Sequence, residues 1–220
     1  MTEPSGGSSD TPRRPVVVPA IALTAFTAVG ITALLGGLRE APEEPEALGP
    51  GAVIDQGQFT TKVVESRVTV ERAQNRFEED KRFVDVVFDV KNNGDETVPV
   101  GVPPQKIESA FTLASFAGSL VKIDPVFPKD AGPYVFARSK GDESRQLHPG
   151  ITSQVVLRYR LKDTEQPPQK ISLDVAAFEW EPDFNNVTPR WKMVATEVGD
   201  KWLPDIKARV TLSVKEGDAA

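Results

Sequence analysis

Apolar and polar residues alternate with a period of two along most of the chain after residue 57. In the clearest stretch, one side of an extended chain carries Val84, Val86, Phe88 and Val90. The other side carries Phe83, Asp85, Val87 and Asp89. This period is that of a β-strand with one face in the core, and Asn93-Gly94 directly after it is a strong turn signal.

The same alternation recurs at 154–161, 171–177 and 206–214, and further strands are predicted at 59–70, 97–102, 110–115, 120–123 and 191–197. A hairpin turn is predicted at Val198-Gly199-Asp200, with Trp191 and Trp202 as core or cross-strand residues on either side. Seven or more short strands without a convincing amphipathic helix predict an all-β fold, an antiparallel β-sandwich over residues 57–214.

Two turn motifs mark this region, Lys91-Asn92-Asn93 and Leu147-His148-Pro149-Gly150. Together with the closing stretch ARVTLSV, they resemble the uncharacterised membrane-anchored, immunoglobulin-like extracytoplasmic domains of Gram-positive, actinobacterial-type bacteria. The resemblance implies an immunoglobulin-like sandwich and a binding or accessory role, without naming a ligand. The segments 124–146 and 180–190 depart from the pattern as insertions.

One segment breaks the alternation: residues 16–38 are 23 residues without a charge. As a helix they would be about 34 Å long, enough to cross a hydrocarbon core of about 30 Å. Arg13 and Arg14 precede the segment, and Glu-rich sequence follows it. The run is longer than the apolar part of a signal peptide, so residues 15–38 are predicted to be an uncleaved transmembrane anchor. The arginines place the N-terminus in the cytoplasm and the C-terminal domain outside the cell membrane.

The remaining segments are simple in composition. Residues 1–14 are predicted to be disordered, residues 39–56 to form a Pro/Glu-rich linker, and residues 215–220 to be a polar tail. The 220-residue chain has a net charge of −6, which argues against nucleic-acid binding. It has no cysteine, so packing alone must hold the exported domain together.

The search for catalytic chemistry finds little. His148 is the only histidine. A Ser/His/Asp relay therefore cannot be built around any other histidine, and a multi-histidine metal site cannot be built at all. The acidic stretch 179–186 offers oxygen ligands but lacks the spacing of a calcium loop, and a glycosidase carboxylate pair stays an unfavoured alternative. We therefore predict no catalytic residue, no metal and no cofactor.

Aromatic residues in the two inserted segments are the candidate partner-binding groups. They are Phe127, Tyr134 and Phe136 in the first, and Trp180 and Phe184 in the second. Aromatic side chains on loops commonly supply the binding energy of interfaces. The alternative, left open for Phe127 and Phe136 above all, is that the rings fold back and cap the core.

Small residues recur at every fourth position of the apolar segment: Ala20, Thr24, Ala28, Thr32 and Gly36. Such a stripe allows close helix packing in lipid and predicts a docking face, for self-association or for a partner's membrane helices. Small residues are common in this segment, so a stripe that arises by chance on a plain anchor is the alternative.

Two function classes follow. The first is a non-enzymatic, membrane-anchored extracytoplasmic interaction module, an accessory or scaffold subunit of a cell-envelope complex such as a transporter. It predicts a flat, partly apolar surface patch and co-purification with another membrane protein. The alternative is a sensor or receptor domain for a small envelope ligand, which predicts a closed concave pocket with convergent polar groups. The few residues before the anchor are too short for a signalling domain, so the first class is favoured.

Overall fold

The computed structural model describes residues 44–217, except 140, 163 and 184–185. The long strands are β3 (Phe59–Glu71), β4 (Lys81–Asn92), β10 (Thr152–Leu161), β11 (Lys170–Ala176) and β16 (Ile206–Lys215). The shorter ones are β1 (Glu46–Leu48), β2 (Val53–Asp55), β5 (Val98–Pro99), β6 (Leu120–Asp124), β7 (Tyr134–Ser139), β8 (Asp142–Ser144), β9 (Gln146–Leu147), β12 (Phe178–Asp183), β13 (Asn186–Met193), β14 (Ala195–Val198) and β15 (Lys201–Pro204). Three short 3-10 helices are η1 (Ile107–Thr112), η2 (Ala117–Ser119) and η3 (Lys129–Ala131).

Most strands belong to one ten-stranded sheet in the order β6-β11-β16-β3-β4-β10-β7-β8, with β1 beside β16 and β2 beside β3. The sheet is mixed rather than purely antiparallel, because β16 pairs in parallel with β1 and, at its C-terminal end, with β3. Three two-stranded pairs complete the domain: β12-β13, β14-β15 and β5-β9. The all-β prediction is confirmed.

The sheet curls around one hydrophobic core. Alternate residues of β4 and β10 face the core, as their period predicts. Ile171 and Leu173 of β11 and Val210 and Leu212 of β16 face the same core from another part of the curled sheet. Phe116, which precedes η2, fills the centre and makes edge-to-face contacts with Phe59 and Phe88.

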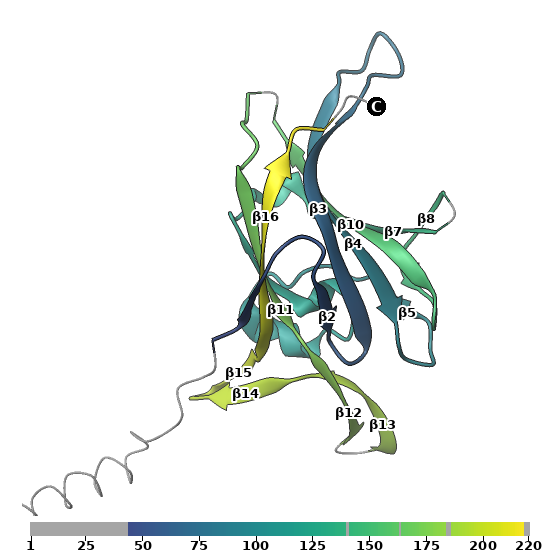
Figure 1. Cartoon of the computed structure of the whole chain (residues 1–220), viewed down its shortest axis with the longest axis vertical. Helices are drawn as coiled ribbons and strands as arrows, with labels where there is room; N and C mark the ends of the chain where they lie inside the picture. Colours follow the sequence, from purple (N-terminus) through teal and green to yellow (C-terminus); the bar gives the residue numbers. More distant parts are fainter. Residues whose placement is uncertain (1–43, 140, 163, 184–185, 218–220) are drawn as a thin grey trace, which may run out of the picture. The chain divides into compact units, whose positions relative to one another are not determined.

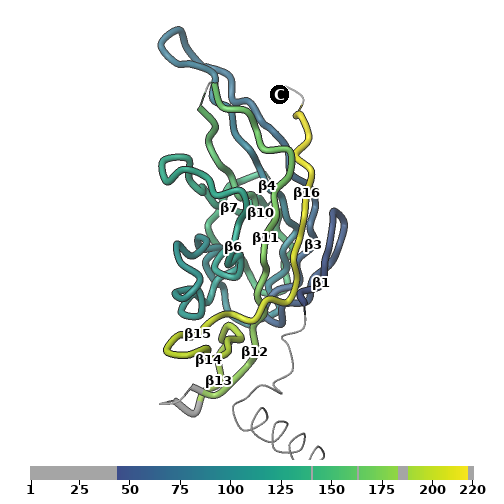
Figure 2. The backbone as a smooth tube through the Cα atoms, turned by 90° about the vertical axis from the view of Figure 1, so that its left-hand side faces the viewer, coloured from purple at the N-terminus to yellow at the C-terminus, as the bar shows by residue number. Residues whose placement is uncertain are grey.

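Both ends of the domain carry hairpins. The strands β12–β15 lie at one end, and the β3–β4 hairpin lies at the other with the C-terminal end of β16 (Figure 1). The second view shows the same separation along the long axis (Figure 2).

Three local expectations need correction. The predicted strand 110–115 is not a strand: its first three residues belong to the 3-10 helix η1, with Ala110 buried, and 113–115 follow that helix. Residues 46–48 and 53–55, which the sequence analysis placed in the linker, pair with β16 and β3, and Ile54 is buried in the core. The strand predicted at 191–197 is divided between β13 and β14. The turn at Gly199 is confirmed, since β14 and β15 form a hairpin around it.

None of the helices within the described ranges is long and apolar enough to cross a membrane. The predicted anchor at 15–38 and the N-terminal segment 1–14 lie outside the described residues.

Candidate functional site: an aromatic and cationic cleft

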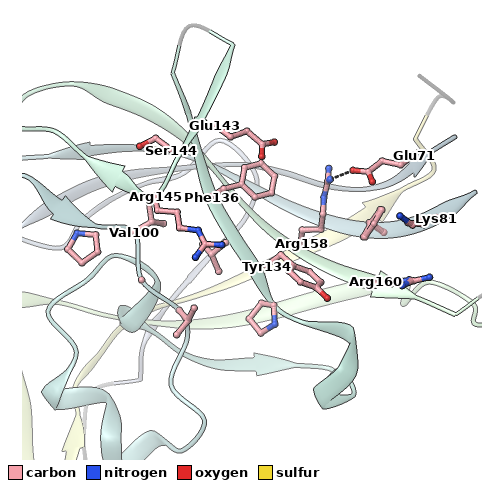
Figure 3. A pocket seen from close by; sticks show the side chains of 16 residues that line it. Glu71, Lys81, Val100, Tyr134, Phe136, Glu143, Ser144, Arg145, Arg158 and Arg160 are labelled. Atoms are coloured by element: carbon pink, nitrogen blue, oxygen red, sulfur yellow. Dashed lines mark hydrogen bonds and ion pairs between the residues drawn. The ribbon is translucent and has the colours of Figure 1, made fainter. Parts of the chain in front are cut away.

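A cleft of about 800 Å³ lies on the face of the sheet that is turned away from the main core. Strands β3, β4, β10 and β7 form its floor, and the segments 99–102 and 143–145 form part of its wall (Figure 3). The register explains why the floor residues share this face. Asp85 pairs with Arg158, which pairs with Tyr134, while Val87 pairs with Val156, which pairs with Phe136.

Arg158 organises the cleft floor. Its Nε and Nη2 donate to the two carboxylate oxygens of Asp85 at 2.7 and 2.8 Å, and its Nη1 donates to Glu71 Oε1 at 2.6 Å. Asp85 is only 1% exposed and accepts a further hydrogen bond from Thr69 Oγ1 at 3.1 Å. A buried carboxylate needs such partners, because desolvation of an unpaired charge is costly.

Two aromatic rings hold the Arg158 guanidinium from the sides. Its central carbon lies 4.8 Å from the centroid of Phe83 and 5.4 Å from that of Phe136. Both distances are within the range of cation–π attraction. The hydrogen bond to Asp85 raises the pKa of Arg158 above its already high ordinary value, so the side chain is charged at every physiological pH.

The cleft offers apolar surface next to these charges. Tyr134 is 52% exposed and Phe136 is half-buried. In the close view the Tyr134 ring lies between Arg145 and Arg160, and Phe136 lies beside Glu143 (Figure 3). An occupant could therefore contact ring faces and cations at once.

The electrostatic balance of the cleft is positive although the chain as a whole is acidic. Four lining residues are cationic (Lys81, Arg145, Arg158 and Arg160) and two are carboxylates (Glu71 and Glu143). Both carboxylates are already paired, Glu71 with Arg158 and Glu143 with Arg138. Lys81, Arg145 and Arg160 are exposed and have no ion-pair partner among the residues that the structure describes.

The structure brings together only some of the aromatic residues predicted to bind partners. Tyr134 and Phe136 both line the cleft. Phe127 does not: its half-buried ring stacks on Tyr159 with centroids 4.0 Å apart and packs against the core, which favours the capping alternative for this residue. Trp180 lies in β12, where it faces Trp191 across the hairpin with ring centroids 5.4 Å apart.

The remaining candidate residues lie outside the described part of the chain. Phe184 is one of them, and so is the small-residue stripe Ala20, Thr24, Ala28, Thr32 and Gly36.

Sequence reasoning missed the cationic residues of the cleft. A usable signal was present in the stretch SQVVLRYRL, where Arg158 and Arg160 share a strand face with the apolar Val156. A second signal was that Phe83 and Val87 share a strand face with Asp85. Such a face is too apolar to be fully solvated. Only the pairing of β4 with β10 shows that these two patterns belong to one surface.

The residues weighed for catalysis or metal binding are dispersed. His148 is exposed in its turn, and its Nδ1 lies 2.9 Å from Thr97 Oγ1. Within the described ranges, no group of three or more histidine, cysteine or acidic side chains is placed to hold a metal ion.

Comparison of the chain with protein-family models, with curated proteins and with solved structures finds no match. The resemblance to membrane-anchored, immunoglobulin-like envelope domains therefore stays an expectation from sequence motifs.

Proposed function

We propose that this protein is a non-enzymatic, extracytoplasmic interaction module that residues 15–38 hold to the cell membrane. Its cleft binds an acidic segment of a cell-envelope protein. The curled all-β domain serves as an immunoglobulin-like sandwich that presents the cleft. A role as accessory or scaffold subunit of an envelope complex fits a domain whose distinctive feature is a binding surface.

The observation that carries the proposal is that an exposed aromatic surface lies next to cations that have no ion-pair partner in the described part of the chain. Tyr134 and Phe136 supply apolar contact area, and Arg145, Arg160 and Lys81 stand around it. Aromatic residues and arginine are the residue types that dominate binding energy at protein interfaces. Because the internal carboxylates are already paired, carboxylates of a partner are the complement that the cleft lacks.

A small-ligand receptor is the second candidate, and one observation favours it. The cleft volume of about 800 Å³ falls within the range of small-molecule sites. A small anionic ligand with an aromatic or apolar part would satisfy the same residues.

Charge reversal in the cleft tests the proposal. The full tagged chain is extracted from its own cells in mild detergent, and co-purifying proteins are quantified for wild type, Arg145→Glu/Arg160→Glu and the control Lys207→Glu. Lys207 is an exposed cation on β16, away from the cleft. We expect Arg145→Glu/Arg160→Glu to lose a co-purifying protein that both the wild type and Lys207→Glu retain. The amount of this protein recovered with the wild type should fall as the salt concentration rises, because salt screens charge pairs.

An unchanged partner set in the cleft variant would refute the cleft as the docking site. Recovery of the wild type without any protein partner, together with a small anion detected by mass spectrometry and lost in the cleft variant, would favour the receptor alternative.

A further inference from the structure

All three tryptophans of the chain lie in two neighbouring hairpins. Trp180 and Trp191 belong to β12–β13, and Trp202 belongs to β14–β15. Trp180 is 50% exposed and Trp202 48% exposed, while Trp191 is half-buried between two surface grooves. Phe111 lines the same groove as Trp202 and is 41% exposed. These four aromatic residues are called the tryptophan end below.

The tryptophan end is also the end at which the chain enters the domain. Strand β1 runs parallel to β16, with Glu46 opposite Ala208. The residues just before Glu46 are therefore level with Ile206, the first residue of β16, which follows β15 closely. The opposite end carries the β3–β4 hairpin and the C-terminal end of β16 (Figure 1).

The length of the tether limits how far this end can be from the membrane. Under the proposed anchoring, on which this inference rests, the apolar segment ends at Leu38 and the described chain begins at Glu44. Six extended residue steps span at most about 22 Å. The domain end that carries the exposed tryptophans must then lie close to the lipid headgroups.

The chemistry of this end suits a membrane interface. Tryptophan concentrates at the boundary of lipid and water, because its ring is apolar and its N–H still finds polar partners there. The charges of the hairpins do not favour an anionic surface: Glu179, Glu181, Glu197 and Asp200 outnumber Arg190, Lys192 and Lys201. Aromatic insertion rather than attraction to anionic headgroups is the mode of contact that these residues support.

We propose that the tryptophan end, through Trp180, Trp202 and Phe111, rests in the outer interface of the membrane to which the chain is anchored. The contact would fix the orientation of the domain on the membrane. Weak insertion suffices, since the tether keeps the effective concentration of the surface high.

Tryptophan fluorescence in lipid nanodiscs tests this contact on the full chain. Residues 15–38 contain no tryptophan, so the whole signal comes from the domain. Nanodiscs of phosphatidylcholine brominated near the headgroup should quench the wild type. The fluorescence of the variant Trp180→Phe/Trp202→Phe, which keeps only Trp191, should be quenched much less than that of the wild type. Addition of anionic lipid should not increase the quenching.

A matched control places a tryptophan at the other end. Phe77 is 82% exposed in the β3–β4 hairpin, and Phe77→Trp in a chain with all three native tryptophans changed to Phe should be unquenched. Equal quenching of this variant and the wild type would overturn the proposal, and so would an unquenched wild type that resists alkaline carbonate extraction. Loss of the full chain from the membrane in carbonate would instead refute the anchoring itself, and this inference with it.

Discussion

Replacement of Arg158 by methionine tests whether the cleft floor depends on the buried ion pair. Methionine keeps the length and much of the volume of the side chain but removes the charge. Asp85, only 1% exposed, would then lose the two hydrogen bonds at 2.7 and 2.8 Å and keep only the one from Thr69. Breaking one partner out of a buried pair costs about 3–5 kcal/mol of folding free energy, because a buried charge is left uncompensated.

The neighbouring Glu71 gives the scale for comparison. Its side chain is 53% exposed, and an exposed ion pair contributes only about 0–1 kcal/mol. Glu71→Ala should therefore cost less than 1 kcal/mol, roughly. The double variant Asp85→Leu/Arg158→Met should recover most of the stability lost in Arg158→Met, because two apolar side chains can replace a buried pair at little net cost.

Thermal unfolding of the full chain in detergent, followed by tryptophan fluorescence, measures these differences. For a domain of this size each kcal/mol shifts the Tm by about 2–4 °C, so Arg158→Met should melt roughly 10 °C below wild type. A shift no larger than that of Glu71→Ala would refute the reasoning, since it would mean that the buried Asp85 can lose Arg158 at no cost. A double variant less stable than Arg158→Met would contradict the isosteric argument.

Three further predictions concern backbone strain, packing and pH. Gly57→Ala should cost at least about 2 kcal/mol in the same melt, because φ is +79° and the new Cβ would collide with the carbonyl oxygen of Phe178. Phe127→Ala should cost about 2 kcal/mol, less than a fully buried Phe, while Tyr134→Ala should stay within about 0.5 kcal/mol; equal losses would contradict their different burial. Burial raises the pKa of Tyr159 above its ordinary 10.0, so the unfolded state ionises first and stability falls as pH rises above 10.0. Tyr159→Phe should remove part of this alkaline loss in a pH series of melts, and identical pH profiles would contradict it.

The five long strands could be predicted from sequence because each carries its own period-two pattern. The six residues 110–115 could not, since so short an apolar pattern does not separate a strand from a helix. In the structure, the half-buried Ile107 and the buried Ala110 are three residues apart, which is the period of the 3-10 helix that holds them both. Ile54 was missed for a similar reason, because a three-residue strand beside Pro- and Glu-rich sequence carries no period at all.

The cleft was half predictable. Tyr134 and Phe136 were found by residue type, but alternation alone assigned Asp85 to solvent. Its burial depends on Arg158, which is 73 residues away in sequence and comes opposite only through the β4–β10 register. The local signal is limited to Phe83 and Val87, which make this strand face more apolar than a solvated one. That pattern does not identify Arg158 as the partner of the buried Asp85.

The two proposed surfaces are related by the length of one strand. Lys81 and Phe83, near the start of β4, line the cleft. The strand ends at Asn92, two residues before Gly94. Gly94 lies next to the tryptophan end, because a Cβ added to it would be 3.2 Å from Trp191 Nε1. The nine steps from Phe83 to Asn92 correspond to about 30 Å at the rise of a β-strand. If the tryptophan end rests on the membrane, the Phe83 end of the cleft is held about this far above it. The opposite wall of the cleft lies nearer, because Pro99 follows Val98, which lines a groove together with Trp180 and Trp191. A partner confined to membrane helices could not reach Arg160, which pairs with Phe83 at that far end. An acidic segment that binds Arg160 must therefore belong to an extracytoplasmic domain or a long exposed loop of the partner.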